Sequence, residues 1–380
     1  MMASWTWLTN PPAPYRGAFV VRVLLKAALL FVLANVLFAL ADPLPLLGRL
    51  SVYHTFVPPR VRLPYGENPQ ESYNLSLTSL DAMLASHAVS APKPSNEFRV
   101  LLLGDSSTWG FLLRPENTVA AYLNADELRA PDGRRVRVYN LGYPEMSLMK
   151  DLLLLDAAMR FQPDLIVWVF TMESFARDNQ LEPLVVRDNP ARARELIETY
   201  EIVLDTSDLP DATLWERTLI GRRRELADWL RLQLYGFTWA ATGIDQQYPA
   251  SFELRASDFE DDATWHTFDS PQTLTRDALA FDVLAAGVER AGDVPVILVN
   301  EPMFISGGRN SDVRYNFFYP RWAYDQYRTL LSELAAERGW RLIDLWDQIA
   351  PDEFTDSPVH LTPDGSRQLA DRIALSIVGE

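Results

Sequence analysis

Short apolar runs without alternation recur along the last three quarters of the chain, separated by stretches in which apolar residues recur at helical spacing. The apolar runs lie at residues 100–103, 136–141, 164–170, 294–299 and 340–345. A strand that is buried on both faces of a parallel sheet forms such a continuous run, whereas a covering helix buries only one stripe. The alternation therefore predicts an α/β fold built on a mainly parallel, five-stranded sheet.

Helices are expected between these strands and after the last one. The expected helices lie at residues 115–128, 148–161, 271–290, 320–338 and from 363 onward. Three of them begin with a residue that can cap a helix or with a proline in the first turn, at Ser147, Ser270-Pro271 and Thr362-Pro363. These residues predict where the three helices begin.

Two regions fall outside this alternation. Residues 42–97 are rich in proline and predict a stalk that lies along or leads up to the main domain at 98–380, with one short helix around 80–88. Between about 175 and 270 the chain has charged helical pieces, at 192–201 and 214–234, and no clear strand. We interpret this second region as a helical insertion over the strand ends, where loops shape the binding site of an α/β fold.

The first long apolar stretch, at residues 18–41, is interrupted only by Arg22 and Lys26. A helix of this length rises 1.5 Å per residue and spans roughly 30 Å, the thickness of a bilayer core. The basic residues lie in its first half, and Asp42 follows it directly. The positive-inside rule predicts a single-pass anchor in the cell membrane, with a cytoplasmic leader at 1–17 and an extracytoplasmic main domain.

Two alternatives compete with a retained anchor. A cleaved signal peptide would use Ala39-Leu40-Ala41, which has the small-x-small form of a cleavage site, and the product would be secreted. A buried core helix would not require the basic flank or the proline-rich exit. The length of the stretch and the tryptophans in the leader, Trp5 and Trp7, favour the anchor.

Composition excludes several classes of function. The formal net charge is −16, with 51 acidic against 35 basic residues, whereas binding to nucleic-acid phosphates needs clustered Lys and Arg. The chain has no cysteine and only four histidines, which excludes disulfides and thiolate metal sites and argues against a histidine-rich metal centre. We therefore expect no cofactor, no metal and no nucleic-acid partner.

The first strand of the predicted sheet leads into a candidate nucleophile. The strand ends at Gly104-Asp105-Ser106-Ser107. A glycine followed by a small hydroxyl residue lets the backbone turn sharply, and it leaves the hydroxyl at the sheet edge where open α/β folds bind ligands. Ser106 is therefore a candidate nucleophile, although the same four residue types also favour an ordinary turn.

A histidine near the C-terminus could activate this serine. A serine hydroxyl is a weak nucleophile until a base accepts its proton. His360 lies on the loop before the last helix, at the same predicted sheet edge as Ser106, and Asp356 lies four residues earlier. Asp356 could hold the imidazole in the required tautomer, while the alternative is that His360 packs or caps locally at the helix start.

Three blocks of residues resemble the SGNH or GDSL-type hydrolases. They are Gly104-Asp105-Ser106-Ser107, Asn140-Leu141-Gly142, and Asp356 to His360 followed by Leu361-Thr362-Pro363-Asp364-Gly365. The resemblance covers about 95–174 and 271–380 and leaves the anchor, the stalk and the insertion outside. It implies a three-layer α/β/α, flavodoxin-like sandwich.

The resemblance also implies roles for individual residues. Ser106 would attack an ester with His360 as its base. The family often places its acid three residues before the histidine, and here that position is Ser357. The acid is therefore expected to be Asp356 or to be absent.

The oxyanion site implied by the family departs from the pattern in this chain. By this resemblance, the oxyanion would be bound by the backbone N–H groups of Ser106 and Gly142 and by an asparagine side chain. Glu173 stands where that asparagine is expected. An ionised carboxylate opposes a developing oxyanion, and the loss of one donor costs about 3 to 4 kcal/mol. Either Glu173 donates in its protonated form beside Ser106, or it points away and another group, such as Asn300, replaces it.

Three functions remain open at this stage. The first is a serine-dependent hydrolase, or esterase, acting outside the membrane on acyl or acetyl esters of carbohydrate or on a small ester. A membrane-anchored chain of this type also resembles accessory O-acyltransferases of cell-wall polymers or exopolysaccharides, which would work with a membrane acyl-transfer partner. The third is a carbohydrate-binding or scaffold protein that kept the fold and lost the oxyanion donor.

Overall fold

In the computed structural model of the chain, the structure describes residues 16–66, 79–210, 213–252 and 255–379. The chain divides into two compact units. The first consists of Met1–Pro45 and Ala212–Ala227, and the second consists of Leu46–Asp211 and Asp228–Glu380. The leader predicted at residues 1–17 lies almost wholly outside the described residues.

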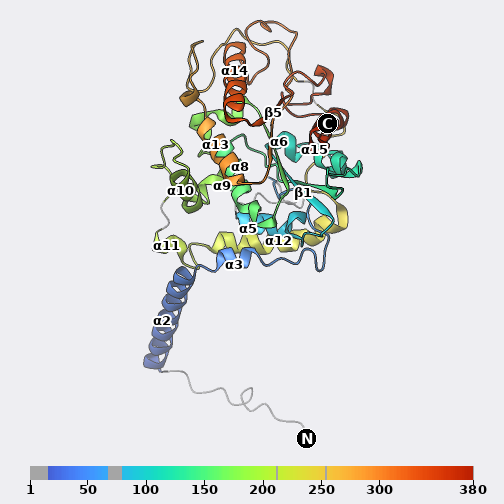
Figure 1. Cartoon of the computed structure of the whole chain (residues 1–380). Helices are drawn as coiled ribbons and strands as arrows, with labels where there is room; N and C mark the ends of the chain where they lie inside the picture. The colour runs from blue at the N-terminus through green and yellow to red at the C-terminus, as the bar shows by residue number, and fades with distance from the viewer. Residues whose placement is uncertain (1–15, 67–78, 211–212, 253–254, 380) are drawn as a thin grey trace. The chain divides into compact units, whose positions relative to one another are not determined.

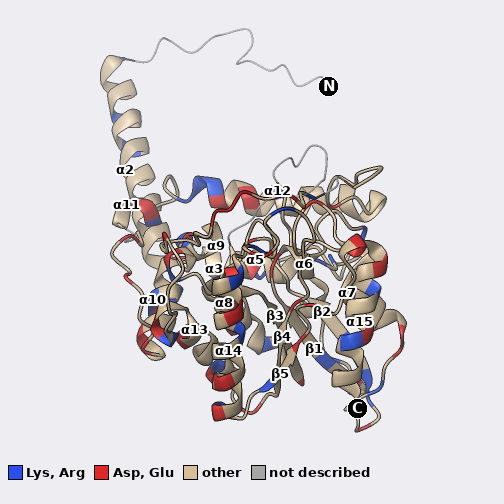
Figure 2. Cartoon of the chain, turned by 90° about the horizontal axis from the view of Figure 1, so that it is seen from above, with Lys and Arg blue, Asp and Glu red and all other residues tan. Residues whose placement is uncertain are grey.

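The first unit contains the apolar helix α2, Gly17–Ala41, and the short helix α11, Leu214–Arg217. The mean hydropathy of α2 is 2.5, and its only charged residues are Arg22 and Lys26, so that the helix is almost entirely uncharged in Figure 2. Its length and composition suit a membrane span, and a signal sequence near the N-terminus would have the same properties.

The second unit is built on a five-stranded parallel sheet in the order β2-β1-β3-β4-β5. The strands are β1 Glu97–Leu103, β2 Arg135–Asn140, β3 Leu165–Phe170, β4 Val296–Asn300 and β5 Arg341–Asp344. This is the flavodoxin-like order, in which the chain switches from one side of β1 to the other and ligands bind at the carboxyl ends beside that switch. The predicted fold class is therefore confirmed.

Helices cover both faces of the sheet and make three layers (Figures 1 and 2). One face carries α8 Leu148–Ala158, α13 Phe281–Ala291 and α14 Arg321–Arg338, and the other carries α7 Val119–Ala125 and α15 Pro363–Val378. Alternate residues of β1 serve the two cores, with Leu101 and Leu103 in the first and Val100 and Leu102 in the second. Burial on both sides explains why the strand sequences show no polar alternation.

The insertion is helical, as predicted, but two helix boundaries predicted from the sequence are wrong. Its other helices are α9 Leu184–Arg187, α10 Pro190–Thr199 and α12 Arg223–Thr242. The stretch predicted as one helix at 214–234 is interrupted between α11 and α12, where a Cβ at Gly221 would lie 2.5 Å from the carbonyl oxygens of Trp215 and Glu216. The helix predicted from Ser270-Pro271 begins only at Phe281, after the separate 3-10 turn Arg276–Ala278.

The proline-rich segment beyond Leu46 is part of the second unit and contains helix α5 Leu80–Ser86. Residues 67–78 of this segment are outside the described residues. Arg62 in the segment is 2 % exposed and donates hydrogen bonds to the Asp245 carboxylate at 2.7 Å and to the carbonyls of Gly110 and Leu113 at 2.8 and 2.9 Å. The segment therefore holds the loop that follows the first block in place.

Candidate active site

The turn after β1 brings Ser106 to the carboxyl edge of the sheet. A short helix, α6 Ser106–Trp109, begins at this serine, and the Asp105 carboxylate caps it by accepting the Ser107 N–H at 2.8 Å. Gly104 permits the turn because a Cβ at this position would lie 2.2 Å from Thr108 Oγ1. The glycine and the capping aspartate thus fix where the Ser106 hydroxyl lies.

His360 and Asp356 meet Ser106 in a continuous series of hydrogen bonds. His360 Nε2 lies 2.8 Å from Ser106 Oγ, and His360 Nδ1 lies 3.0 Å from Asp356 Oδ1. In the tautomer with a proton on Nδ1, the imidazole donates to Asp356 and accepts from the Ser106 hydroxyl. The Phe111 ring packs on the imidazole with 4.9 Å between ring centroids, which restricts its rotation.

The charge of Asp356 is stabilised by this arrangement. Burial would raise the pKa of the Asp356 carboxyl, but the hydrogen bond and charge of His360 outweigh burial and lower its pKa below the ordinary value. The loop that carries both residues is closed by its own backbone, since Thr355 N–H donates to the His360 carbonyl and Thr362 N–H donates to the Glu353 carbonyl, each at 2.8 Å. The acid and the imidazole are therefore held at a fixed separation.

Gly142, the third predicted site residue at this edge, follows β2 and lies against α6. A Cβ at this position would lie 2.5 Å from Trp109 N, so only glycine fits. Its N–H donates to Asn140 Oδ1 at 3.0 Å, and Asn140 Nδ2 donates to the Thr108 carbonyl at 2.8 Å. Within the described part of the chain, the Ser106 N–H has no hydrogen-bond acceptor.

Glu173, which stands where the family pattern has its asparagine, has both carboxylate oxygens engaged by other side chains. One carboxylate oxygen lies 2.7 Å from His266 Nε2 and the other accepts the Trp265 indole N–H at 3.3 Å. Both oxygens thus bind side chains of the insertion and neither bonds to Ser106. Asn300, the alternative donor, is also engaged, because its amide donates to Asp344 at 2.8 Å inside the core.

His266 is held between two carboxylates. Besides Glu173 at Nε2, Asp178 Oδ1 lies 3.2 Å from Nδ1. Burial alone would lower the pKa of His266, but the hydrogen bonds and charges of Glu173 and Asp178 outweigh it and raise its pKa above the ordinary value. Nothing in the sequence indicates this pair of contacts, because His266 lies far along the chain from both Glu173 and Asp178.

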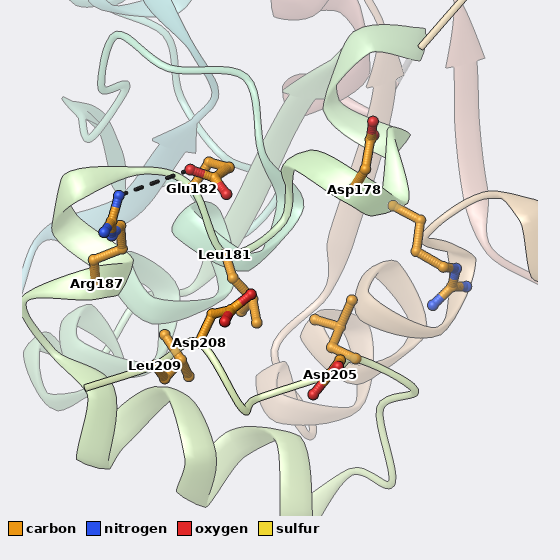
Figure 3. A pocket seen from close by; sticks show the side chains of 9 residues that line it. Asp178, Leu181, Glu182, Arg187, Asp205, Asp208 and Leu209 are labelled. Atoms are coloured by element: carbon orange, nitrogen blue, oxygen red, sulfur yellow. Dashed lines mark ion pairs between the residues drawn. The ribbon is translucent and has the colours of Figure 1, made fainter. Parts of the chain in front are cut away.

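Two cavities flank this histidine. One, of about 270 Å³, is lined by Glu173, Asp262, Thr264, Trp265, His266, Arg314, Phe317 and Phe318. The other, of about 490 Å³, is lined by acidic, basic and leucine side chains, and Figure 3 shows Asp178, Asp205 and Asp208 around it with an ion pair between Glu182 and Arg187. Neither cavity is lined by the serine and histidine of the hydrogen-bonded series. No group of His and acidic residues in the described ranges could hold a metal ion.

Sequence reasoning missed a buried lysine behind the nucleophile. Lys150 in α8 is fully buried, and its ammonium donates to the Gly104 carbonyl at 2.8 Å and to the Tyr143 carbonyl at 3.1 Å. Its charge is balanced by Asp151 at 2.6 Å. Lys150 thus ties together the turns after β1 and β2, and its only signal in the sequence is a lysine within an otherwise apolar helix.

A buried glutamate was missed as well. Glu301, directly after β4, is 1 % exposed and accepts a hydrogen bond from Ser107 Oγ. Burial, and next the negative charge of Asp105, raise the pKa of the Glu301 carboxyl well above its ordinary value. Two carboxyl groups in one buried site do not ionise as easily as separate ones, so this site favours the protonated form of Glu301 more than water does.

Comparisons with known proteins give structural likenesses only. No protein-family model matches the chain, and no curated protein sequence matches it. Among solved structures, it is similar to a lipase/acylhydrolase from Enterococcus faecalis at 16% identity, covering 74% of this chain and 95% of that one with a TM-score of 0.38. A G-D-S-L family protein from Desulfitobacterium hafniense DCB-2 has 12% identity, 73% and 98% coverage and a TM-score of 0.35.

A third likeness is to a carbohydrate acetylesterase family member from Sinorhizobium meliloti, with 12% identity, 74% and 99% coverage and a TM-score of 0.33. Values this low do not transfer an activity from those proteins to this chain. The chain's own strand order, with the serine after β1 and the histidine loop before α15, is the flavodoxin-like arrangement that the resemblance of its sequence blocks implies.

Proposed function

We propose that this chain is a serine-dependent ester hydrolase of the SGNH/GDSL type. The observation that carries the proposal is the series Ser106 Oγ, His360 and Asp356, with separations of 2.8 and 3.0 Å. Ser106 Oγ attacks the ester carbonyl while His360 Nε2 takes its proton, and Asp356 stays ionised and holds the imidazolium. His360 then protonates the departing alcohol, and water cleaves the acyl-enzyme by the same route.

The oxyanion would be bound by backbone groups. The Ser106 N–H is available, and the Gly142 N–H becomes available if the substrate oxygen replaces or shares Asn140 Oδ1 as its acceptor. No side-chain donor is assigned, because Glu173 and Asn300 are engaged elsewhere. Since one donor contributes about 3 to 4 kcal/mol, we expect turnover that is slow for an esterase with a complete site.

The proposed substrate class is an acyl or acetyl ester of a carbohydrate. The cavity of about 270 Å³ beside Glu173, which is not lined by Ser106 or His360, supports a subsite for the carbohydrate only, because Phe317 lies there next to carboxylates that can accept hydrogen bonds from hydroxyl groups. A sugar hydroxyl in place of water as the acceptor would make the same acyl-enzyme an O-acyltransferase. The two outcomes share every step up to deacylation.

The test uses the full-length protein in detergent. Ser106→Ala should abolish labelling by a fluorophosphonate probe and remove turnover of p-nitrophenyl acetate, whereas Ser332→Ala, an exposed serine on α14, should preserve both. Acetylated product after addition of an oligosaccharide would identify a transferase. Absence of labelling in the wild-type protein would leave only a binding or scaffold role.

For the location we infer a retained anchor at α2 with the main domain outside the cell membrane. The support is the length and apolar character of the helix together with its basic first half. Mass spectrometry should find the leader attached, and added protease should digest the main domain in spheroplasts. A mature N-terminus near Asp42 would instead mean a cleaved signal, and protease protection would reverse the topology.

A further inference from the structure

Helix α12 has two faces of unusual character within the second unit. One face is buried and contains Leu232, Gly236 and Trp239. The opposite face is exposed, yet it presents Leu230, Leu234 and Phe237, which are 53, 57 and 48% exposed. The exposed side of a helix in a water-soluble domain normally carries polar residues. An exposed stripe of leucine and phenylalanine is therefore unusual for a helix that faces water.

The buried face of α12 packs on the chain segment that follows Leu46. Trp229 Nε1 donates to the Leu50 carbonyl at 3.3 Å, and Tyr53 Oη donates to the Leu232 carbonyl at 3.0 Å. Gln233 accepts the Val52 N–H at 3.0 Å. Because of these contacts, α12 and the segment from Leu46 to Phe56 form one continuous piece of surface (Figure 1).

That segment adds more exposed apolar side chains. Leu46, Leu50 and Phe56 are 68, 56 and 75% exposed. Together with Leu230, Leu234 and Phe237 they make up what we call the apolar face. Elsewhere on the second unit, large exposed apolar residues are isolated, for example Leu184 and Leu375, and single exposed residues of this kind need no partner.

We propose that the apolar face is a lipid-contact surface that rests in the interface of the bilayer holding α2. The proposal rests on the anchor inferred above and does not depend on the esterase activity. Only residues 42–45 separate the end of α2 at Ala41 from Leu46, and a chain of five residue steps extends at most about 17 Å. Leu46 therefore cannot leave the vicinity of the headgroups, where an apolar helix face inserts about 5 to 10 Å.

The net charge of the chain also indicates which headgroups the apolar face would contact. The chain carries a formal charge of −16, so anionic headgroups would repel it overall. The arginines next to the leucines of the apolar face are both paired with acids, Arg231 with Asp228 at 2.7 Å and Arg49 with Asp81 at 3.5 Å. Binding would then depend on apolar burial and would occur on zwitterionic lipid. A protein partner would have to compete with lipid that the tether keeps permanently close.

The experiment uses the absence of cysteine in the native sequence, which allows one label at one position. Full-length Leu234→Cys and Phe237→Cys variants, carrying an environment-sensitive dye, are reconstituted in phosphatidylcholine vesicles. Leu184→Cys and Leu375→Cys are matched controls, because these leucines are similarly exposed on the second unit. We expect lipids brominated on the acyl chains to quench the two α12 labels and aqueous iodide to quench the two controls.

Each other outcome overturns the proposal in a different way. Iodide quenching at Leu234 equal to that at Leu375 would mean that the face lies in water. Protection from iodide without quenching by brominated lipid would mean that a protein, such as a second copy of the chain, covers the face. Failure of the protein to float with the vesicles would refute the anchor itself, and ester turnover measured on the same samples reports separately on the catalytic proposal.

Discussion

Two histidines of the second unit have a carboxylate partner at Nδ1. They differ in the group that lies at Nε2, the other ring nitrogen. His360 has Asp356 at Nδ1 and the Ser106 hydroxyl at Nε2, whereas His266 has Asp178 at Nδ1 and Glu173 at Nε2. A hydroxyl can give its proton to the ring and a carboxylate cannot. The first arrangement can therefore transfer a proton, whereas the second favours the protonated form of its ring.

The comparison shows that proximity of acid and imidazole is not sufficient to identify a catalytic group. The raised pKa of His266 extends the pH range over which its ring is protonated, which suits an ion pair that joins the insertion to the end of β3. Its contribution to stability is present at pH values below the ordinary histidine pKa and is lost as the pH rises through its folded-state pKa. His360 needs the opposite state, because a base must be neutral at the start of the reaction.

The largest expected effect comes from exchanging each histidine for glutamine. His360→Gln removes the proton acceptor of Ser106, and kcat for p-nitrophenyl acetate should fall by a factor on the order of 10⁴ or more. His266→Gln removes an ion pair outside the hydrogen-bonded series and should change kcat by less than about tenfold. Similar losses in the two variants, with both folded by circular dichroism, would contradict the division of roles.

A third histidine sharpens the comparison because it has no acid. His87 is fully buried, and burial lowers its pKa to about 4 while its Nδ1 accepts the Val89 N–H at 3.1 Å. In the unfolded chain it binds a proton near pH 6.5, so the folded state loses stability as the pH falls from 6.5 toward 4, by about 3 kcal/mol. His87→Asn keeps an acceptor for Val89 and should lose less stability than the wild type between pH 7 and 4.5 in urea unfolding.

The result for His87 has its own internal control. At pH 7.5 His87 is neutral in both folded and unfolded chains, so the free-energy difference between variant and wild type there reports packing alone. A difference between variant and wild type that stays the same at pH 7.5 and 4.5 would show that His87 does not govern acid sensitivity.

The smallest effect on turnover is expected at Glu173. Glu173→Gln removes one of the two negative charges beside His266, so the pKa of His266 should fall, as followed by NMR titration of its ring, and turnover should change only a few-fold. Glu173→Asn supplies the donor that the family pattern expects. A rise in turnover above about tenfold in this second variant would mean that residue 173 does face the oxyanion.

Much of the second unit follows from local sequence. Continuous apolar runs identify the five strands because a strand buried on both faces has no polar side, and Gly104 and Asp105 dictate the turn that exposes Ser106. Asp356 and His360 lie on one short loop, so their pairing is also a local property. The candidate nucleophile, base and acid were all predictable for this reason.

Other features depend on residues that are distant in the chain. Nothing near Glu173 in sequence indicates that Trp265 and His266 bind its carboxylate, and nothing near Glu301 indicates that Asp105 shares its buried site. Lys150 and Arg62 are ordinary basic residues until the fold buries them against backbone carbonyls. By itself, the sequence determined the strands, the apolar helix and the residues of the candidate triad, because short-range periodicity and turn chemistry encode them. Only the tertiary structure decided which polar groups are buried together, because burial and charge pairing arise between segments that the chain order keeps apart.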